Sequence, residues 1–128
     1  MTHPNAEVLE RAFGAFGRDP IIVARSLADD IVWRVPGATA MGGEYRGRDE
    51  VLRFLRQTIV LTDRTYRTEL EYVVANDERA VAVYRARGER EGRALDIRQA
   101  LFCEVRDGQL ADVTAVPFDF AAFESFWT

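Results

Sequence analysis

Residues 93–117 read RALDIRQALFCEVRDGQLADVTAVP, and this stretch decides the fold. Up to the turn at Asp107-Gly108, apolar and polar side chains alternate along the chain, as they do on a strand with one buried face. Gln99 is the only polar side chain on the apolar face, whose other members are Leu95, Ile97, Leu101, Cys103 and Val105. Because Asp-Gly favours a two-residue hairpin loop, the stretch predicts two antiparallel strands over 93–106 and 109–117.

Two further strands are expected just before this hairpin, over 64–75 and 80–90, with a turn at Asn76 to Arg79. A three-residue loop at 77–79 would set three opposite-charge pairs across the two strands: Glu71–Arg85, Glu69–Arg87 and Arg67–Glu89. The opposite, apolar face would then carry Leu70, Tyr72, Val74, Ala82, Tyr84 and Ala86. We expect the charged face to be a solvated ladder of ion pairs.

The first half of the chain is mainly helical. Apolar spacing predicts helices over 5–16, 20–28 and 49–59, a strand over 31–35, and a loop over 38–47. A short C-terminal helix follows Asp119, which we expect to cap it. The predicted fold is α+β: a curved, mixed but mainly antiparallel sheet forming a cone, with three helices on its concave side and the short terminal helix. We expect one domain over 1–128, with residues 1–4 flexible.

Composition excludes several kinds of chemistry. All 17 basic residues are arginine, so there is no lysine for Schiff-base catalysis. The single histidine, His3, and the single cysteine, Cys103, give neither a catalytic triad nor a histidine or thiolate metal site. Net charge is −4 without a basic stripe, which disfavours nucleic acid. The sequence has no membrane-spanning run or signal peptide, so we expect a cytoplasmic protein with no cofactor and no metal.

Several segments resemble the SnoaL-like polyketide-cyclase group. They are ADDIVWRVPG at 28–37, YRGRDEV at 45–51, Phe54-Leu55, RDGQL at 106–110 and FESFW at 123–127. This group shares a superfamily with ketosteroid isomerase and nuclear transport factor 2. The resemblance implies the cone-shaped fold around an apolar pocket, and a homodimer through the outer face of the sheet. It implies no single activity, because the scaffold hosts isomerases, cyclases, hydrolases, dehydratases and non-enzymes.

The catalytic positions of the superfamily are occupied here by other residues. The general base of ketosteroid isomerase, an Asp before the Pro that ends the first strand, corresponds to Val35. Its tyrosine on the first helix corresponds to the segment Arg-Ala-Phe at 11–13, and its protonated Asp falls at Leu101 or near Gln99. The acidic residue of the cyclases falls at Ala115. The resemblance therefore implies a pocket but identifies no catalytic residue.

Gln99 is the main candidate for ligand binding, because an amide on an apolar inward face can orient a ligand carbonyl. The alternative is a core amide satisfied by backbone or by Tyr84. Trp33 either donates its indole N–H to a ligand or simply packs in the core, and Tyr72 and Tyr84 either line the pocket or form a cross-strand pair. The full set of predicted pocket residues is Trp33, Val35, Met41, Leu55, Tyr72, Tyr84, Gln99 and Leu101.

Three functions remain open from the sequence. The first is a cofactor-free isomerase, cyclase or hydrolase acting on a small apolar oxygenated metabolite. The second is a non-catalytic ligand-binding or accessory protein, and the third is a dimeric interaction module. The inward face of the last strand is open too: the Asp107-Gly108 turn places Asp112 and Thr114 inside, whereas the resemblance places Val113 and Ala115 there, and a bulge would reconcile the two.

Overall fold

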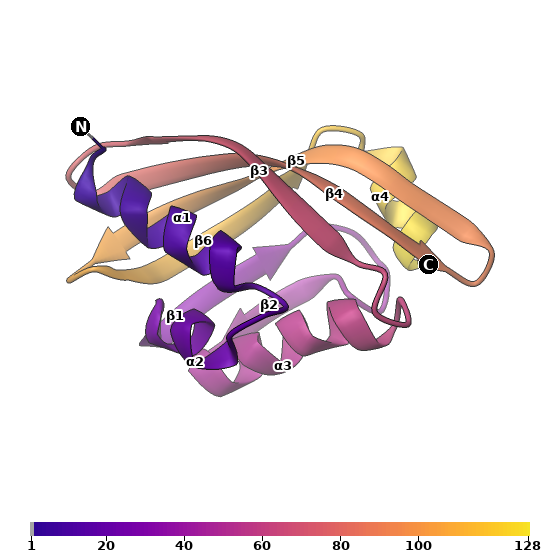
Figure 1. The fold of residues 1–128 in the computed structure, drawn as a ribbon. Helices are drawn as coiled ribbons and strands as arrows, with labels where there is room; N and C mark the ends of the chain where they lie inside the picture. Colours follow the sequence, from indigo (N-terminus) through magenta and orange to yellow (C-terminus); the bar gives the residue numbers. More distant parts are fainter. Residues whose placement is uncertain (1) are drawn as a thin grey trace.

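The computed structural model describes residues 2–128 as a six-stranded sheet with helices packed on it (Figure 1). The strand order is β2-β1-β6-β5-β4-β3. The elements are α1 (Pro4–Ala15), α2 (Pro20–Arg25), β1 (Leu27–Val35), β2 (Gly43–Arg46), α3 (Arg48–Val60), β3 (Arg67–Ala75), β4 (Arg79–Arg90), β5 (Arg93–Arg106), β6 (Gln109–Pro117) and α4 (Phe120–Trp127).

The sheet is mixed, as predicted. The β1–β6 pair is parallel, and every other neighbouring pair is antiparallel. The long strands β3 to β6 twist and curve, and α1, α2 and α3 lie together on one side of the sheet while α4 lies near the hairpin that joins β4 to β5 (Figure 1). The core lies between this concave side and the helices. No helix among residues 2–128 combines the length and the apolar character needed to cross a membrane.

Side-chain caps mark the beginning of α1, α2 and α4. Asp19 accepts hydrogen bonds from the backbone of Ile21 and Ile22, with Pro20 as the first residue of α2. Asp119 caps α4 in the same way. The expectation of flexibility at residues 1–4 includes Met1, which lies outside the described residues. His3 caps α1 through its Nδ1, which accepts from the Asn5 amide at 3.0 Å.

Two element boundaries differ from the sequence prediction because β1 is longer than expected. The predicted helix over 20–28 ends at Arg25, since the chain leaves the helix to pair with β6: the Leu110 amide donates to the Ser26 carbonyl. The strand expected over 31–35 consequently begins at Leu27. The loop predicted over 38–47 contains β2, whose Tyr45 lies opposite Trp33 of β1.

The predicted register between β3 and β4 is wrong. Glu69 pairs with Arg85 rather than Arg87, and a bulge at Glu71 shifts the register between Leu70 and Tyr72. The Glu71 carboxylate instead binds Arg98 of β5 at 2.7 and 3.1 Å. Because an extra residue reverses the side-chain parity, the last part of β3 turns Val73 and Ala75 to the core and exposes Tyr72 and Val74.

A second bulge settles the orientation of β6. Glu104 pairs with Asp112 and Val105 pairs with Leu110, so Ala111 is the extra residue. Val113 and Ala115 are buried as the resemblance implied, although the turn starts in the register that the sequence indicated. Asp112 therefore points outward, where its carboxylate accepts from Arg34 at 2.8 and 2.9 Å.

Candidate functional site

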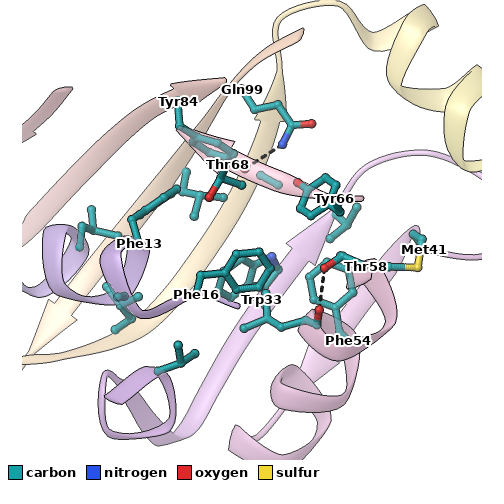
Figure 2. A pocket seen from close by; sticks show the side chains of 18 of the residues that line it. Phe13, Phe16, Trp33, Met41, Phe54, Thr58, Tyr66, Thr68, Tyr84 and Gln99 are labelled. Carbon is teal, nitrogen blue, oxygen red and sulfur yellow. Dashed lines mark hydrogen bonds between the residues drawn. The ribbon is translucent and has the colours of Figure 1, made fainter. Parts of the chain in front are cut away.

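The concave side of the sheet and the helices enclose a cavity (Figure 2). The cavity volume is about 90 Å³. One water molecule needs roughly 10–15 Å³ of such space. The space suits a ring-sized molecule. Its lining consists of Leu9, Ala12, Phe13, Phe16, Val23, Leu27, Trp33, Val35, Met41, Phe54, Leu55, Thr58, Tyr66, Thr68, Tyr84, Gln99, Leu101, Leu110, Ala115, Phe123 and Trp127.

Every lining side chain within residues 2–128 is uncharged. The only titratable groups among them are the phenols of Tyr66 and Tyr84. Burial raises the pKa of Tyr66 well above its usual range, and burial also raises the pKa of Tyr84, because an ionised phenolate would be poorly solvated there. Both tyrosines are therefore neutral hydroxyl groups at physiological pH, and the wall of the cavity is electrically neutral.

Gln99 and Tyr84 are hydrogen-bonded to each other in the wall of the cavity. The two residues lie opposite each other on β5 and β4, and the Gln99 Nε2 donates to the Tyr84 hydroxyl at 2.7 Å. The other half of the amide, Oε1, is buried and has no hydrogen-bond partner, even though the Tyr66 hydroxyl lies on the same side of the cavity (Figure 2). One end of the amide therefore bonds Tyr84, as the core interpretation of Gln99 expects, and the other end is unpaired.

Trp33 supplies a second unpartnered polar group. Its indole packs against Phe54 of α3, with ring centroids 5.9 Å apart, and its Nε1 is buried without an acceptor. Burying an N–H without a partner costs about 1–3 kcal/mol. A buried tryptophan usually avoids that cost because its N–H finds a hydrogen-bond partner.

The structure places all but one of the predicted pocket residues around the cavity. Trp33, Val35, Met41, Leu55, Tyr84, Gln99 and Leu101 all belong to the lining. Tyr72 does not: its side chain is 56% exposed on the outer face of the sheet. The bulge at Glu71 is the physical reason, because it reverses the face to which Tyr72 points.

Sequence reasoning missed the residues that precede this bulge and those on the helices. Thr68 lies on the inward side of β3 and Tyr66 comes just before that strand, and their alternation with Arg67 and Glu69 would have indicated this side. Phe13 and Phe16 come from the end of α1, where the helical stripe indicated burial but not which element they would face. Phe13 packs on Tyr84, with ring centroids 4.9 Å apart.

Cys103 and Asp119 do not line the cavity. Cys103 is buried but is not part of the lining, and burial raises the pKa of its thiol to about 12, so it stays protonated. Asp119 caps α4. Within residues 2–128, no three side chains of His, Cys, Asp or Glu gather as a metal site requires.

Comparison with known proteins agrees with this architecture. The model of the SnoaL-like domain matches residues 9–113. The chain belongs to the SnoaL-like domain family. Its fold is the nuclear transport factor 2-like fold that the resemblance implied, a mostly antiparallel sheet with N-terminal helices and a short terminal helix.

The relatives of this SnoaL-like domain cover nearly its whole length. It is 37% identical to an uncharacterised protein of Mycobacterium tuberculosis over 123 residues, 94% of each chain. It superposes on Bal32a from a soil-derived mobile gene cassette with a TM-score of 0.94 at 25% identity, covering 98% of this chain and 97% of that one. TerC, co-crystallised with polyporic acid, gives a TM-score of 0.83 at 19% identity, covering 97% and 98%.

Proposed function

We propose that this SnoaL-like domain binds a small, uncharged, largely apolar molecule in its cavity without transforming it. The observation that carries the proposal is the neutral lining, in which aromatic and aliphatic side chains surround a few hydroxyl, amide and indole groups. Apolar pockets with a small number of oriented polar groups are the usual form of small-molecule sites. TerC, which shares the fold, was crystallised with a small molecule.

Acid–base catalysis would need a proton carrier near the substrate with a pKa near the working pH. The positions that correspond to the superfamily's acids are Val35, Leu101 or Gln99, and Ala115; all are buried and none is an acid. The remaining carriers are Tyr66 and Tyr84, whose raised pKa values make their hydroxyls hydrogen-bond donors but poor bases. An isomerase, cyclase or hydrolase built on this cavity would depend on a substrate that supplies its own labile proton.

Intrinsic fluorescence tests binding directly, because Trp33 and Trp127 are the only tryptophans and both line the cavity. We expect native mass spectrometry of protein from its own host to show a retained small molecule. Adding an extract of apolar metabolites to emptied protein should change the tryptophan emission. Ala115→Leu, which fills part of the cavity, should abolish both signals, whereas Thr114→Leu on the outer face should retain them. Equal signals from the two variants would contradict binding in this cavity.

A second observation supports the expected homodimer. The outer face of the sheet carries an apolar patch, defined as Tyr72, Val74, Phe102 and Val116, which are 39–57% exposed. The patch is continuous, because Val81 and Val83 of β4 lie between β5 and the two patch residues of β3, Tyr72 and Val74. Exposed apolar patches with a polar rim usually mark interaction sites.

We propose that a second copy of the chain covers this apolar patch. Its rim consists of ion pairs that place both signs of charge on each side: Arg98–Glu71 and Arg85–Asp96 on one, Arg79–Glu104 and Arg34–Asp112 on the other. A surface with balanced charges is its own electrostatic complement, which an isologous dimer requires. Sedimentation velocity should give a dimer that Phe102→Glu converts to monomer and Ile21→Glu, on α2, leaves intact. A monomer at all concentrations would refute it.

A further inference from the structure

The two longest helices on the concave side cover opposite ends of the sheet. α1 packs mainly on β3 and β4, whereas α3 packs mainly on β1 and β2. In the strand order β2-β1-β6-β5-β4-β3, these pairs are the two ends of the sheet. The central strands β5 and β6, which supply Gln99, Leu101 and Ala115 to the cavity, therefore face the space between α1 and α3 (Figure 1). Side chains of the two helices close that space.

The exposure of the lining residues indicates where the cavity approaches the surface. Every lining residue on α2, α4, β1, β4, β5 and β6 is buried. The half-buried lining residues come from the end of α1, from α3 and from the beginning of β3, namely Ala12, Phe13, Phe16, Leu55, Tyr66 and Thr68. The cavity thus comes nearest to solvent between these three elements.

Phe16 is placed to move at this opening. It follows α1 as the C-cap residue, with its backbone outside the helical region, and the next residue, Gly17, has a φ of 76°. Its ring meets Tyr66 edge-on, with ring centroids 6.2 Å apart, whereas Phe13 packs more closely on Tyr84, at 4.9 Å. A ring directly after the helix, held by an edge contact, can change rotamer while the helix stays in place.

The other movable parts of the wall are tied down by hydrogen bonds. The loop between β1 and β2 supplies Met41 to the lining, and the Tyr45 hydroxyl donates to the Met41 carbonyl at 2.7 Å. Arg90 and Arg93 donate to backbone carbonyls at the end of α4 at 2.7–3.1 Å, which fastens that helix to the β4–β5 hairpin. The Phe16 ring has no polar atom and is held by packing.

We propose that the Phe16 ring is the gate of the cavity: it closes the opening between α1 and α3 against Tyr66 and swings out to admit small uncharged molecules. This inference rests on the proposed function, because it describes how the binding site is reached. The lining behind the gate consists of uncharged side chains, so an ion that entered would lose its hydration without gaining a counter-ion.

Acrylamide quenching of tryptophan fluorescence tests the gate without a ligand. Trp33 and Trp127, the only tryptophans, both line the cavity and are 7% and 3% exposed. Phe16→Ala should raise the bimolecular quenching constant, measured from emission lifetimes, by about 2- to 10-fold, the factor by which loss of one aromatic contact favours the open state. Quenching by iodide should rise less than quenching by acrylamide, because iodide is charged.

Matched variants separate a gate from a general loosening of the fold. Phe118→Ala removes a phenylalanine that is exposed outside the cavity and should leave quenching unchanged. Val35→Ala enlarges the cavity away from the gate and should raise acrylamide quenching less than Phe16→Ala does. Phe16→Leu keeps an apolar side chain and should give an intermediate constant. Labelling of the buried Cys103 by iodoacetamide reports opening of the sheet, and its rate should be unchanged in Phe16→Ala.

The outcomes separate the gate from the proposed function. A larger increase in quenching with Met41→Ala than with Phe16→Ala would move the entrance to the loop between β1 and β2 and overturn the gate. Parallel increases in quenching and in Cys103 labelling would overturn it too, because the whole fold would then be opening. Unchanged quenching in Phe16→Ala, with a molecule retained from the host, would refute the gate alone. Faster quenching in Phe16→Ala, with no retained molecule and no response to the extract, would support the gate and refute binding.

Discussion

Replacing Gln99 and Tyr84 together should make the protein more stable than the wild type. Their side chains are buried and joined by the 2.7 Å bond from Nε2 to the hydroxyl, while Oε1 of Gln99 has no partner. Removing both partners of a buried hydrogen bond in favour of apolar groups is nearly neutral. The double variant Gln99→Leu, Tyr84→Phe also removes the orphaned Oε1, which relieves about 1–3 kcal/mol.

The single variants should behave differently from each other. Tyr84→Phe keeps the ring contact with Phe13 but removes the hydroxyl that accepts from Gln99 Nε2, which should cost about 1–3 kcal/mol. Gln99→Leu leaves the Tyr84 hydroxyl unpaired but removes Oε1, so the two effects nearly cancel. The double variant should therefore exceed the sum of the singles by about 2–6 kcal/mol in unfolding free energy.

Urea unfolding followed by circular dichroism measures these differences for all four proteins. The expected order of stability is double variant, then wild type and Gln99→Leu together, then Tyr84→Phe. A double variant less stable than the wild type, with additive single effects, would refute the reasoning. It would mean that Oε1 already has a partner in solution.

Three other predictions concern stability. Gly42→Ala should destabilise the fold by several kcal/mol, since its Cβ would lie 2.1 Å from a backbone carbonyl oxygen. Gly92→Ala has open space around the added Cβ and a φ of 77°, so it should cost only about 1 kcal/mol. Thermal unfolding measures both changes. Burial raises the pKa of the Cys103 thiol from 9.0 to about 12, so ionisation of the unfolded thiol should reduce stability as pH rises from 9 to 12. Cys103→Ala should flatten the slope of unfolding free energy against pH by up to about 1.4 kcal/mol per pH unit. An unchanged slope would argue against burial of the thiol. Ala115→Asp places a carboxyl in the cavity, where desolvation raises its pKa, so its stability should fall as pH rises above about 4, while Thr114→Asp on the outer face should show no such loss in urea titrations.

Strong local patterns made most of the sheet predictable. The alternation around Gln99 and the Asp107-Gly108 turn located β5, β6 and the polar residue on the inner face. Helix starts were equally clear where a cap and a proline coincide, as at Asp19-Pro20. In each case the signal is local, because the residues that specify the element lie within it or beside it.

The two bulges show where local patterns fail. Glu71 leaves the β3–β4 ladder to bind Arg98 on a strand that is distant in sequence, and no periodicity in β3 records that partner. Tyr72 and Val74 are apolar yet exposed, so polarity alone assigns them to the wrong face. In β6 the register set by the turn disagrees with the one implied by the family resemblance, and the bulge at Ala111 accounts for the disagreement.

The cavity was less predictable than its sheet-side wall. Strand parity identified Trp33, Gln99 and Leu101, but the contributions of Phe16 and Thr58 depend on how α1 and α3 lie across the sheet. That arrangement is fixed by packing between elements. The unpaired states of the Trp33 and Gln99 atoms are likewise visible only in three dimensions.

The parallel pairing of β1 with β6 has a consequence for biosynthesis. β1 is made early, but the strand that it needs on one side, residues 109–117, is made only after β2 to β5. Until then, β1 and β2 form a ribbon with an open, apolar edge, which is prone to pair with other chains. The hairpins of β3 to β6 require only neighbouring segments and can form first. Until β6 emerges, a nascent chain therefore lacks the part of the cavity wall that β6 supplies. Its need for chaperone protection should end abruptly when residue 117 emerges.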